Sequence, residues 1–442
     1  MSSVQLIPFV EKLEFAPSFQ AELLERIRLW ANELGFSQIG VASVDLSHAE
    51  KGLLDWLQKG FHGEMSYMSA HGLKRARPAE LVPGTLSVLT AKMDYLPRDT
   101  QTQEGQWLQV ERSRLKRKTE GVISVYARGR DYHKVMRRRL EQLAKRIQTE
   151  IGTLGYRVFT DSAPVLEVEL ATQSGLGWRG KHTLLLSRDS GSMFFLGEIY
   201  LNLQLEPTPK QDPHCGTCSA CIDICPTGAI TEPYVLDARK CISYLTIEHS
   251  GSIPVELRGK MGNHIYGCDD CQTACPWNKY ARPSVVEDFD ARGALVPVSN
   301  PSFDLAGGVG QGGKLIDYFS WTEQEFEEKT RGTAIHRIGH ERWLRNVAVA
   351  MGNALSKAMS NSMSNSMNNS MNNSMDTALT NHQHKNSREA DPLDMQEPPP
   401  SERLLIAKAL SARLNHPSAL VVEHVRWALS KLDERVDQDL EV

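Results

Sequence analysis

Eight cysteines carry the clearest chemistry in this 442-residue chain, and all of them lie between positions 215 and 275. The first four form the run Cys215-Gly-Thr-Cys218-Ser-Ala-Cys221-Ile-Asp-Ile-Cys225-Pro226. A C-x2-C-x2-C-x3-C-P run binds 4Fe–4S clusters in bacterial proteins, and its fourth cysteine ligates the other cluster of a pair. The run therefore predicts two clusters and requires a second set of ligands.

A second, shorter motif supplies that set. The segment Cys268-Asp-Asp-Cys271-Gln-Thr-Ala-Cys275-Pro276 lacks one cysteine of the full run, and Cys241 is the only cysteine that remains to complete it. We expect one cluster to be bound by Cys215, Cys218, Cys221 and Cys275, and the other by Cys225, Cys241, Cys268 and Cys271.

Two alternatives compete with redox-active clusters. Paired C-x2-C motifs also build structural zinc sites, but two C-x3-C-P endings and the use of all eight thiols favour iron and sulfur. The clusters could instead serve only to stabilise a small domain. Two adjacent clusters form an electron relay, so we favour a role in electron transfer.

The segments around the cysteines predict three consecutive parts. Residues 1–205 alternate helical and strand patterns and indicate an α/β (α+β) domain. Residues 206–285 are rich in turn residues and form a ferredoxin-like domain with two clusters. Residues 286–442 predict an all-α domain of paired, HEAT-like helices, interrupted at 356–400 by an Asn-, Ser- and Met-rich insertion that we expect to be disordered.

Individual elements follow from hydrophobic periodicity and β-branched content. Apolar residues at steps of three and four predict helices over 20–35, 131–152, 322–330 and 340–354. Strands are expected over 120–126, 156–160 and 193–203. Helical sequence resumes at Ser401, after the insertion.

Composition and charge place the chain among soluble proteins. It is 40% hydrophobic and 24% charged, with a net charge of −4. The N-terminus lacks a secretory signal, and no apolar run approaches the roughly 20 residues that span a bilayer. We therefore predict a cytoplasmic protein without a membrane segment. Basic residues concentrate between positions 112 and 146, either as a solvated helix face or as a surface for a polyanion.

The electron acceptor does not follow from these motifs alone, since the N-terminal domain has no G-x-G-x-x-G after a strand and no P-loop. Four stretches, the cysteine pattern among them, nevertheless resemble one family. They are YARGRDYH from Tyr126, FTDSAPVLEVELA from Phe159, GLGWRGKH from Gly175, and the complete cysteine pattern with RKCISYLTIEH and GNHIYGCDDCQTACPWN. Together they resemble epoxyqueuosine reductase, from about residue 20 to 355 and again after 400.

The resemblance implies a cobalamin-dependent enzyme with two clusters that reduces epoxyqueuosine to queuosine in the anticodon loop of tRNA, the last step of queuosine biosynthesis. Residues 1–205 would form its cobalamin-binding catalytic domain. An external low-potential donor would supply electrons, and we expect a monomer. The rival interpretations are a corrinoid reductive dehalogenase, which usually carries an export signal, and a ferredoxin-type electron carrier, which would leave residues 1–205 unexplained.

The same resemblance assigns roles to individual residues. Asp161 matches the proton donor that protonates the epoxide oxygen, although Asp-Ser-Ala-Pro before an apolar run is also a good helix start. Asp131 and His133 would shape the pocket, or serve only structural hydrogen bonds. The positions that match cobalamin contacts, each of which could equally be ordinary packing or surface, are Arg75, Ser124, Asp161, Leu185, Leu196 and Ser243.

Overall fold

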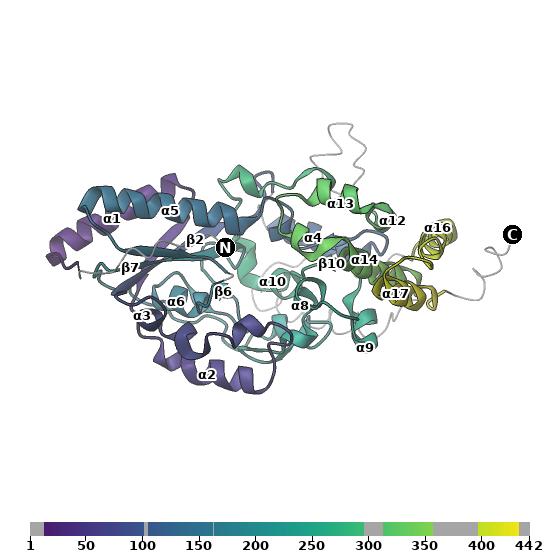
Figure 1. Cartoon of the computed structure of the whole chain (residues 1–442), viewed down its shortest axis with the longest axis horizontal. Coiled ribbons are helices and arrows are strands. Elements are labelled where there is room, and N and C mark those ends of the chain that lie inside the picture. The colour runs from purple at the N-terminus through teal and green to yellow at the C-terminus, as the bar shows by residue number, and fades with distance from the viewer. Residues whose placement is uncertain (1–12, 101–104, 162, 296–312, 357–396, 433–442) are drawn as a thin grey trace, which may run out of the picture. The chain divides into compact units, whose positions relative to one another are not determined.

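The computed structural model describes residues 13–100, 105–161, 163–295, 313–356 and 397–432, and it mixes helices with sheet (Figure 1). Its contacts divide the chain into two compact units. The first comprises Met1–Arg98, Asp131–Gly216 and Tyr280–Phe289, and the second comprises Asp99–Arg130, Thr217–Lys279 and Asp290–Val442. Segments of the two units alternate along the chain. The sequence instead predicted three consecutive domains, and that division remains a prediction.

A four-stranded antiparallel sheet forms the centre of the first unit. Its strands follow the order β1-β2-β7-β4. Their bounds are β1 Gln38–Ala42, β2 Ser87–Asp94, β7 Phe194–Leu201 and β4 Tyr156–Phe159. All eight residues of β2 are buried, and neighbouring strands pair with both of its edges. The sequence predicted β4 and β7 but not β1 or β2.

Helices cover both faces of this sheet (Figure 1). On one face lie α1 (Pro17–Glu33) and α5 (Tyr132–Ile151), which confirm two predicted helices. The buried stripe of α5 includes Met136 and Leu140, and an added Cβ on Gly197 of β7 would lie 2.8 Å from Leu140 Cδ1. On the opposite face, α6 (Glu167–Gln173) contacts β1, β2 and β7.

The remaining elements of the first unit are short. A hairpin is made by β5 and β6, and several 3₁₀ turns connect the longer elements. The bounds are α2 Ser47–Gln58, η1 Ser66–Met68, η2 Gly72–Ala76, α3 Pro78–Leu81, β5 Trp178–Arg179, β6 Leu185–Leu186 and η8 Glu287–Phe289.

The second unit holds seven of the eight cysteines among short elements. Here β3 (Val122–Ile123) pairs in parallel with β10 (His264–Tyr266), so the strand expected over 120–126 is only two residues long. The other elements up to Leu295 are α4 Gln106–Lys116, η4 Val125–Ala127, α7 Ala220–Asp223, β8 Ile230–Glu232, β9 Val235–Leu236, η5 Ala238–Lys240, α8 Ile242–Ile247, α9 Val255–Arg258, η6 Gly259–Met261, α10 Asp270–Thr273, η7 Pro276–Tyr280 and η9 Gly293–Leu295.

Helices complete this unit, as the sequence predicted. They are α12 Leu315–Ser320, α13 Glu323–Thr330, η10 Ile335–Ile338, α14 Gly339–Leu355, α16 Pro400–Ser411 and α17 Ala419–Leu429. A capping box between Thr322 and Glu325 begins α13. The central helix α14 packs closely against α17, where an added Cβ on Gly352 would lie 2.8 Å from Ala428 Cα.

The predicted disordered insertion falls largely outside the described residues, which stop at Ser356 and resume at Glu397. Among the helices that the structure describes, none combines the length and apolar character needed to span a bilayer.

Candidate active site

Asp161 lies in the loop between β4 and α6 in the first unit. Its backbone has φ of 42°, a left-handed conformation that few residues other than glycine adopt. Such strain is common where a loop must present a side chain for function. The side chain is 48% exposed, so its carboxylate is accessible to a ligand.

Two side chains from the start of α5 contact the same oxygen of Asp161. Tyr132 donates its hydroxyl proton to Oδ2, and His133 Nε2 lies 3.1 Å from that atom. The other ring nitrogen of His133 lies 2.8 Å from Asp131 Oδ1. Asp131 also caps α5 by accepting a bond from the His133 amide, so the helix start fixes the whole group.

The two carboxylates change the protonation of His133. Burial alone would lower the pKa of His133, but hydrogen bonds and charge from Asp131 and Asp161 outweigh burial and raise it to about 9. His133 is therefore an imidazolium at neutral pH. It presents a positive charge and a proton to Oδ2 of Asp161.

A second layer of acidic groups lies behind the Asp161 loop. Glu167, the first residue of α6, accepts a hydrogen bond from the Asp161 amide through Oε1. Burial and the charge of Asp161 raise the pKa of Glu167 to about 8. Glu198 of β7 is completely buried, and neither of its carboxylate oxygens has a hydrogen-bond partner among the residues that the structure describes.

Arg75 ties this loop to the segment before α3. The guanidinium donates to the carbonyl oxygens of Tyr67 at 2.8 Å, Met68 at 3.2 Å and Ala163 at 3.3 Å. The side chain is 4% exposed. These bonds occupy three of its five N–H groups and give Arg75 a structural role next to Asp161.

An apolar cluster lies on the α6 side of the sheet. Leu185 is buried there with Leu176 and Phe194, and the half-buried Leu196 packs against it. Leu196 and Glu198 share one face of β7, because side chains two residues apart on a strand point the same way.

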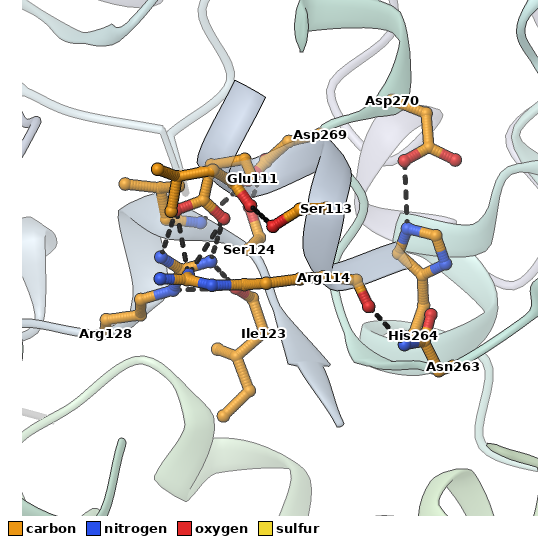
Figure 2. A network of polar contacts seen from close by, with 12 residues as sticks. Glu111, Ser113, Arg114, Ile123, Ser124, Arg128, Asn263, His264, Asp269 and Asp270 are labelled. Carbon is orange, nitrogen blue, oxygen red and sulfur yellow. Dashed lines mark hydrogen bonds and ion pairs between the residues drawn. The ribbon is translucent and has the colours of Figure 1, made fainter. Parts of the chain in front are cut away.

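In the second unit, a polar network anchors the loop that carries Cys268 and Cys271 (Figure 2). Asp269 accepts hydrogen bonds from the Ser124 hydroxyl and from the Val125 amide at 2.8 Å. Burial raises the pKa of Asp269, and these donors oppose the rise. Ser124 is itself buried, so its hydroxyl proton is committed to the cysteine loop.

The same network extends to α4. Glu111 accepts bonds from Arg128 at 2.7 Å and from Arg114 at 2.8 Å (Figure 2). Burial alone would raise the pKa of Glu111, but the two arginines hold it below its ordinary value. Both arginines are buried, so this part of the basic run is structural.

The cysteines themselves are all described, and none of the eight forms a disulfide. Cys268 and Cys271 are half-buried, and desolvation raises the pKa of both thiols well above the ordinary value. The nearby sulfur of Cys241 raises both values further, and Cys225 acts in the same way on Cys241 and Cys271. Cys221, which the sequence assigned to the other cluster, also raises the pKa of Cys271. Thiols of both predicted sets therefore lie near one another, and such sulfur donors suit soft metal clusters.

A histidine and a carboxylate lie next to this set. The ligand atoms of His264, Cys268 and Asp270 lie within 4.8 Å of one another, and His264 Nε2 is 3.0 Å from Asp270 Oδ1 (Figure 2). Since His264 also bonds the Met261 carbonyl at 2.8 Å, the ring is fixed from both sides. This arrangement orients the cysteine loop.

Comparison with known proteins identifies the family. A protein-family model for a 4Fe-4S double cluster binding domain matches residues 214–278, and one described as "Epoxyqueuosine reductase QueG, DUF1730" matches residues 75–162. The epoxyqueuosine reductase of Alicycliphilus denitrificans is 55% identical over 411 residues, which cover 93% of this chain and 98% of that protein. The chain belongs to the epoxyqueuosine reductase family. The Escherichia coli epoxyqueuosine reductase is 50% identical over 333 residues, 75% of this chain and 82% of the relative.

Solved structures of epoxyqueuosine reductases share the fold. A selenomethionine-labelled enzyme aligns with a TM-score of 0.66 at 22% identity, covering 94% of this chain and all of that one. Another, crystallised with an epoxyqueuosine-modified stem loop of tRNA-Tyr, aligns with a TM-score of 0.65 at 23% identity, covering 93% and 99%. The family predicted from the sequence is therefore confirmed. It is favoured over the alternatives of a reductive dehalogenase and an electron carrier.

The predicted site residues of this epoxyqueuosine reductase fall in both units. Arg75, Asp161, Leu185 and Leu196 belong to the first unit, and Ser124 and Ser243 belong to the second. Ser243 is half-buried on α8. Cys215 belongs to the first unit, and the other seven cysteines belong to the second. The assignments to cobalamin and to individual clusters remain predictions.

Sequence reasoning about this epoxyqueuosine reductase missed Glu167 and Glu198. Glu198 stands alone as an acid in Phe-Phe-Leu-Gly-Glu-Ile-Tyr-Leu, the β7 sequence. A single carboxylate in an otherwise apolar strand was the available signal, because burying a charge without a partner is costly.

Proposed function

We propose that this chain reduces the epoxide of epoxyqueuosine in tRNA to the alkene of queuosine, and that Asp161 delivers a proton to the epoxide oxygen. Family membership supports the reaction. The observation that carries the role of Asp161 is its accessible carboxylate, whose Oδ2 is held by Tyr132 and His133.

The net reaction consumes two electrons and two protons and releases one water. The ring oxygen must be protonated as its bonds to carbon break, because an alkoxide is a poor leaving group. His133 contributes a fixed positive charge next to Asp161 and orients its carboxylate. The backbone strain at Asp161 suits a loop that must move. In support, one solved epoxyqueuosine reductase is described with its catalytic aspartate loop swung out of the active site.

Two 4Fe–4S clusters fit the cysteines as a relay for these electrons. The match to a double-cluster domain supports them, as does the proximity of Cys221, Cys225 and Cys241 to Cys271. We assign Cys215, Cys218, Cys221 and Cys275 to the other cluster. A low-potential donor outside the chain would reduce them one electron at a time.

Fewer observations support a bound cobalamin than support the two clusters. When bound, it would supply a cobalt centre able to pass electrons to the substrate carbon. Leu196 offers an apolar contact and Asp161 a polar one. Arg75 and Leu185 are buried, so they would act by shaping the site in the first unit. Ser124 and Ser243 belong to the second unit, and their assignment to cobalamin rests on the family resemblance alone. We further propose a cytoplasmic monomer.

The test is turnover by the full-length protein, purified without oxygen and supplied with cobalamin and a strong one-electron reductant. Transfer RNA that carries epoxyqueuosine is incubated, digested to nucleosides and analysed by mass spectrometry. We expect queuosine to appear as epoxyqueuosine disappears. Unchanged epoxyqueuosine, with clusters shown by their spectrum to be reduced, would refute the proposal.

A further inference from the structure

The two cysteine motifs contain the same helical turn but carry different charges. Helix α7 begins after Ser219 and helix α10 begins after Asp269, and each of these residues directly follows a cysteine. Their backbones are nearly identical, with φ and ψ of −120° and 6° at Ser219 and of −109° and 10° at Asp269. Neither side chain caps its helix. The turn therefore does not require an acid at Asp269, which is only 9% exposed, whereas Ser219 is exposed.

Neutral donors from the segment after β3 hold the carboxylate of Asp269. Ser124 donates its hydroxyl proton to Oδ1, and the Val125 amide donates to Oδ2 at 2.8 Å (Figure 2). Because each carboxylate oxygen accepts a proton that belongs to a neighbour, the group is an ionised carboxylate. Neutral donors of this kind stabilise the negative charge without cancelling it.

The same donors fix the turn of residues 268–271 that carries two of the cysteines. The Ser124 amide donates to the Tyr266 carbonyl oxygen at 2.8 Å. Gly267 has φ of 69°, and an added Cβ there would lie 2.6 Å from Ser124 Cβ, so the chain approaches β3 too closely for any other residue. Asp269 thus completes an anchor that holds the turn against the end of β3.

Asp269 belongs to a largely buried group of four charged side chains. Glu111 accepts hydrogen bonds from Arg114 at 2.8 Å and from Arg128 at 2.7 Å (Figure 2). The positive charge of Arg128 also acts on Asp269, where it opposes the rise in pKa that burial causes. Two arginines and two acids together are neutral. Without the charge of Asp269, the group would carry one positive charge next to the turn.

Asp270, the other acid of the turn, has a counter-charge of its own. His264 Nε2 lies 3.0 Å from Asp270 Oδ1, and His264 Nδ1 lies 2.8 Å from the Met261 carbonyl oxygen. Since both partners are acceptors, both ring nitrogens carry a proton, and His264 with Asp270 forms a neutral ion pair. Among the described residues, Asp269 is therefore the acid of this turn that no cation contacts directly.

A fixed buried charge matters next to a redox centre. One electron from the external donor would make a cluster bound at Cys268 and Cys271 more negative by one charge. A nearby carboxylate makes this step less favourable, because a buried environment screens charges only weakly. The net charge around an iron–sulfur cluster is one of the factors that set its reduction potential.

We propose that Asp269 is a positioning residue of the electron relay: it fixes the turn of residues 268–271, and its charge lowers the reduction potential of the cluster bound there. This inference rests on the clusters of the proposed function. The neutral Ser219 occupies the equivalent place in the other turn. Asp269 thus makes the cluster at Cys268 a stronger reductant once that cluster has received its electron.

Asp269→Asn tests the charge, because asparagine keeps the shape of the side chain and still accepts a hydrogen bond. The full-length protein is purified without oxygen and poised at a series of potentials, and electron paramagnetic resonance measures the reduced clusters. We expect one of the two reduction equilibria to shift about tenfold toward the reduced form, which is about 59 mV for one electron. The other equilibrium and the iron content should match the wild type.

Two matched variants separate charge from packing. Asp223→Asn removes an exposed carboxylate between Cys221 and Cys225, where water and salt screen its charge. Ser124→Ala breaks the anchor of Asp269 without removing a charge. Neither variant should favour the reduced form. A shift in either variant equal to that in Asp269→Asn would overturn the proposal, because burial of the charge would then be irrelevant or a loosened turn would explain the effect.

The outcomes also separate this inference from the proposed function. If the wild type holds no iron–sulfur clusters, the relay of the proposed function fails. If the wild type holds both clusters and both equilibria of Asp269→Asn stay within about twofold of it, only the role of Asp269 fails. Should Asp269→Asn lose iron, Asp269→Ser replaces it, because serine occupies the equivalent place in the other turn; wild-type potentials there would overturn the proposal.

Discussion

Asp161 combines a left-handed backbone with a carboxylate that two donors hold by one oxygen. Asp131, Tyr132 and His133 are consecutive, so a single helix start supplies both donors and the group that orients them. The motif YARGRDYH supplies Tyr132 and His133, and the motif TDSAP supplies the Asp161 carboxylate that they contact.

Asp161→Asn removes the transferable proton and preserves the shape of the side chain. We expect turnover of epoxyqueuosine to fall at least about 100-fold, with iron content unchanged. Nucleoside analysis and iron determination measure the two properties. The control is Asp55→Asn, which alters an exposed carboxylate on α2. Full activity of Asp161→Asn would remove this residue from the mechanism.

His133 should make stability depend on pH. Its pKa is raised to about 9 in the folded chain from 6.5, so its stabilising effect is complete below pH 6.5 and disappears as pH rises through 9. Allowing for the exposure of Asp161, the effect is about 1–2 kcal/mol. Thermal midpoints of wild type and His133→Gln should therefore differ more at pH 6 than at pH 9.5.

A matched variant checks the cause. Asp131→Asn removes one of the two acidic partners and should flatten the same pH dependence partially. A gap between wild type and His133→Gln that is equal at both pH values would show that packing, and not charge, explains the effect of His133.

The candidate site could be predicted only in part at this scale. Asp161, Asp131 and His133 follow from a family resemblance, and the eight cysteines follow from spacing. Glu167 and Glu198 could not be identified because their chemistry depends on burial, which a sequence pattern reports only indirectly. Glu198 needed the register of β7 against β4 to be placed behind Asp161.

Elements with a strong hydrophobic periodicity were predicted correctly from the sequence. A strand that mixes apolar and polar residues was missed. Helix α5 agrees with its expected bounds within one residue at each end. Strand β2 was missed because Thr90, Lys92 and Asp94 make it look polar, although all three are buried. Lys92 is satisfied there by Ser187 at 3.1 Å and Ser190 at 3.0 Å, partners about 95 residues away.

Two helical glycines give opposite predictions. Gly352→Ala should destabilise the packing of α14 on α17 by about 1–3 kcal/mol, since the new Cβ would lie 2.6 Å from Trp427 Cζ3 and 2.8 Å from Ala428 Cα. Gly52→Ala on α2 meets no atom within 4 Å and should stabilise by about 0.5–1 kcal/mol. Thermal unfolding measures both. A neutral Gly352→Ala would contradict the close contact.

At the scale of the whole chain, the basic run of residues 112–146 separates into two kinds of side chain. Arg114, Lys118 and Arg128 are buried and bonded to glutamates. Arg137 and Arg138 on α5 are 65% and 63% exposed, and Lys134 is exposed with them. Only the second kind is available to phosphate groups, which sequence alone could not distinguish.

Replacing Lys134, Arg137 and Arg138 together by alanine should weaken tRNA binding and its salt dependence. The slope of log affinity against log salt concentration should fall by about 2, as three phosphate contacts are lost. Fluorescence anisotropy over a salt series measures it. Lys51→Ala on α2 combined with Lys59→Ala, directly after that helix, is the control. An unchanged slope would exclude α5 from the RNA surface.

The order of strands also has a consequence for synthesis on the ribosome. The central strand β2 needs β7, whose last residue is more than 100 positions further along the chain. At roughly 5–20 residues per second, one edge of β2 keeps its backbone N–H and C=O groups unpaired for about 5–20 s while translation continues. Nascent chains should therefore require chaperone protection until residue 201 has left the exit tunnel.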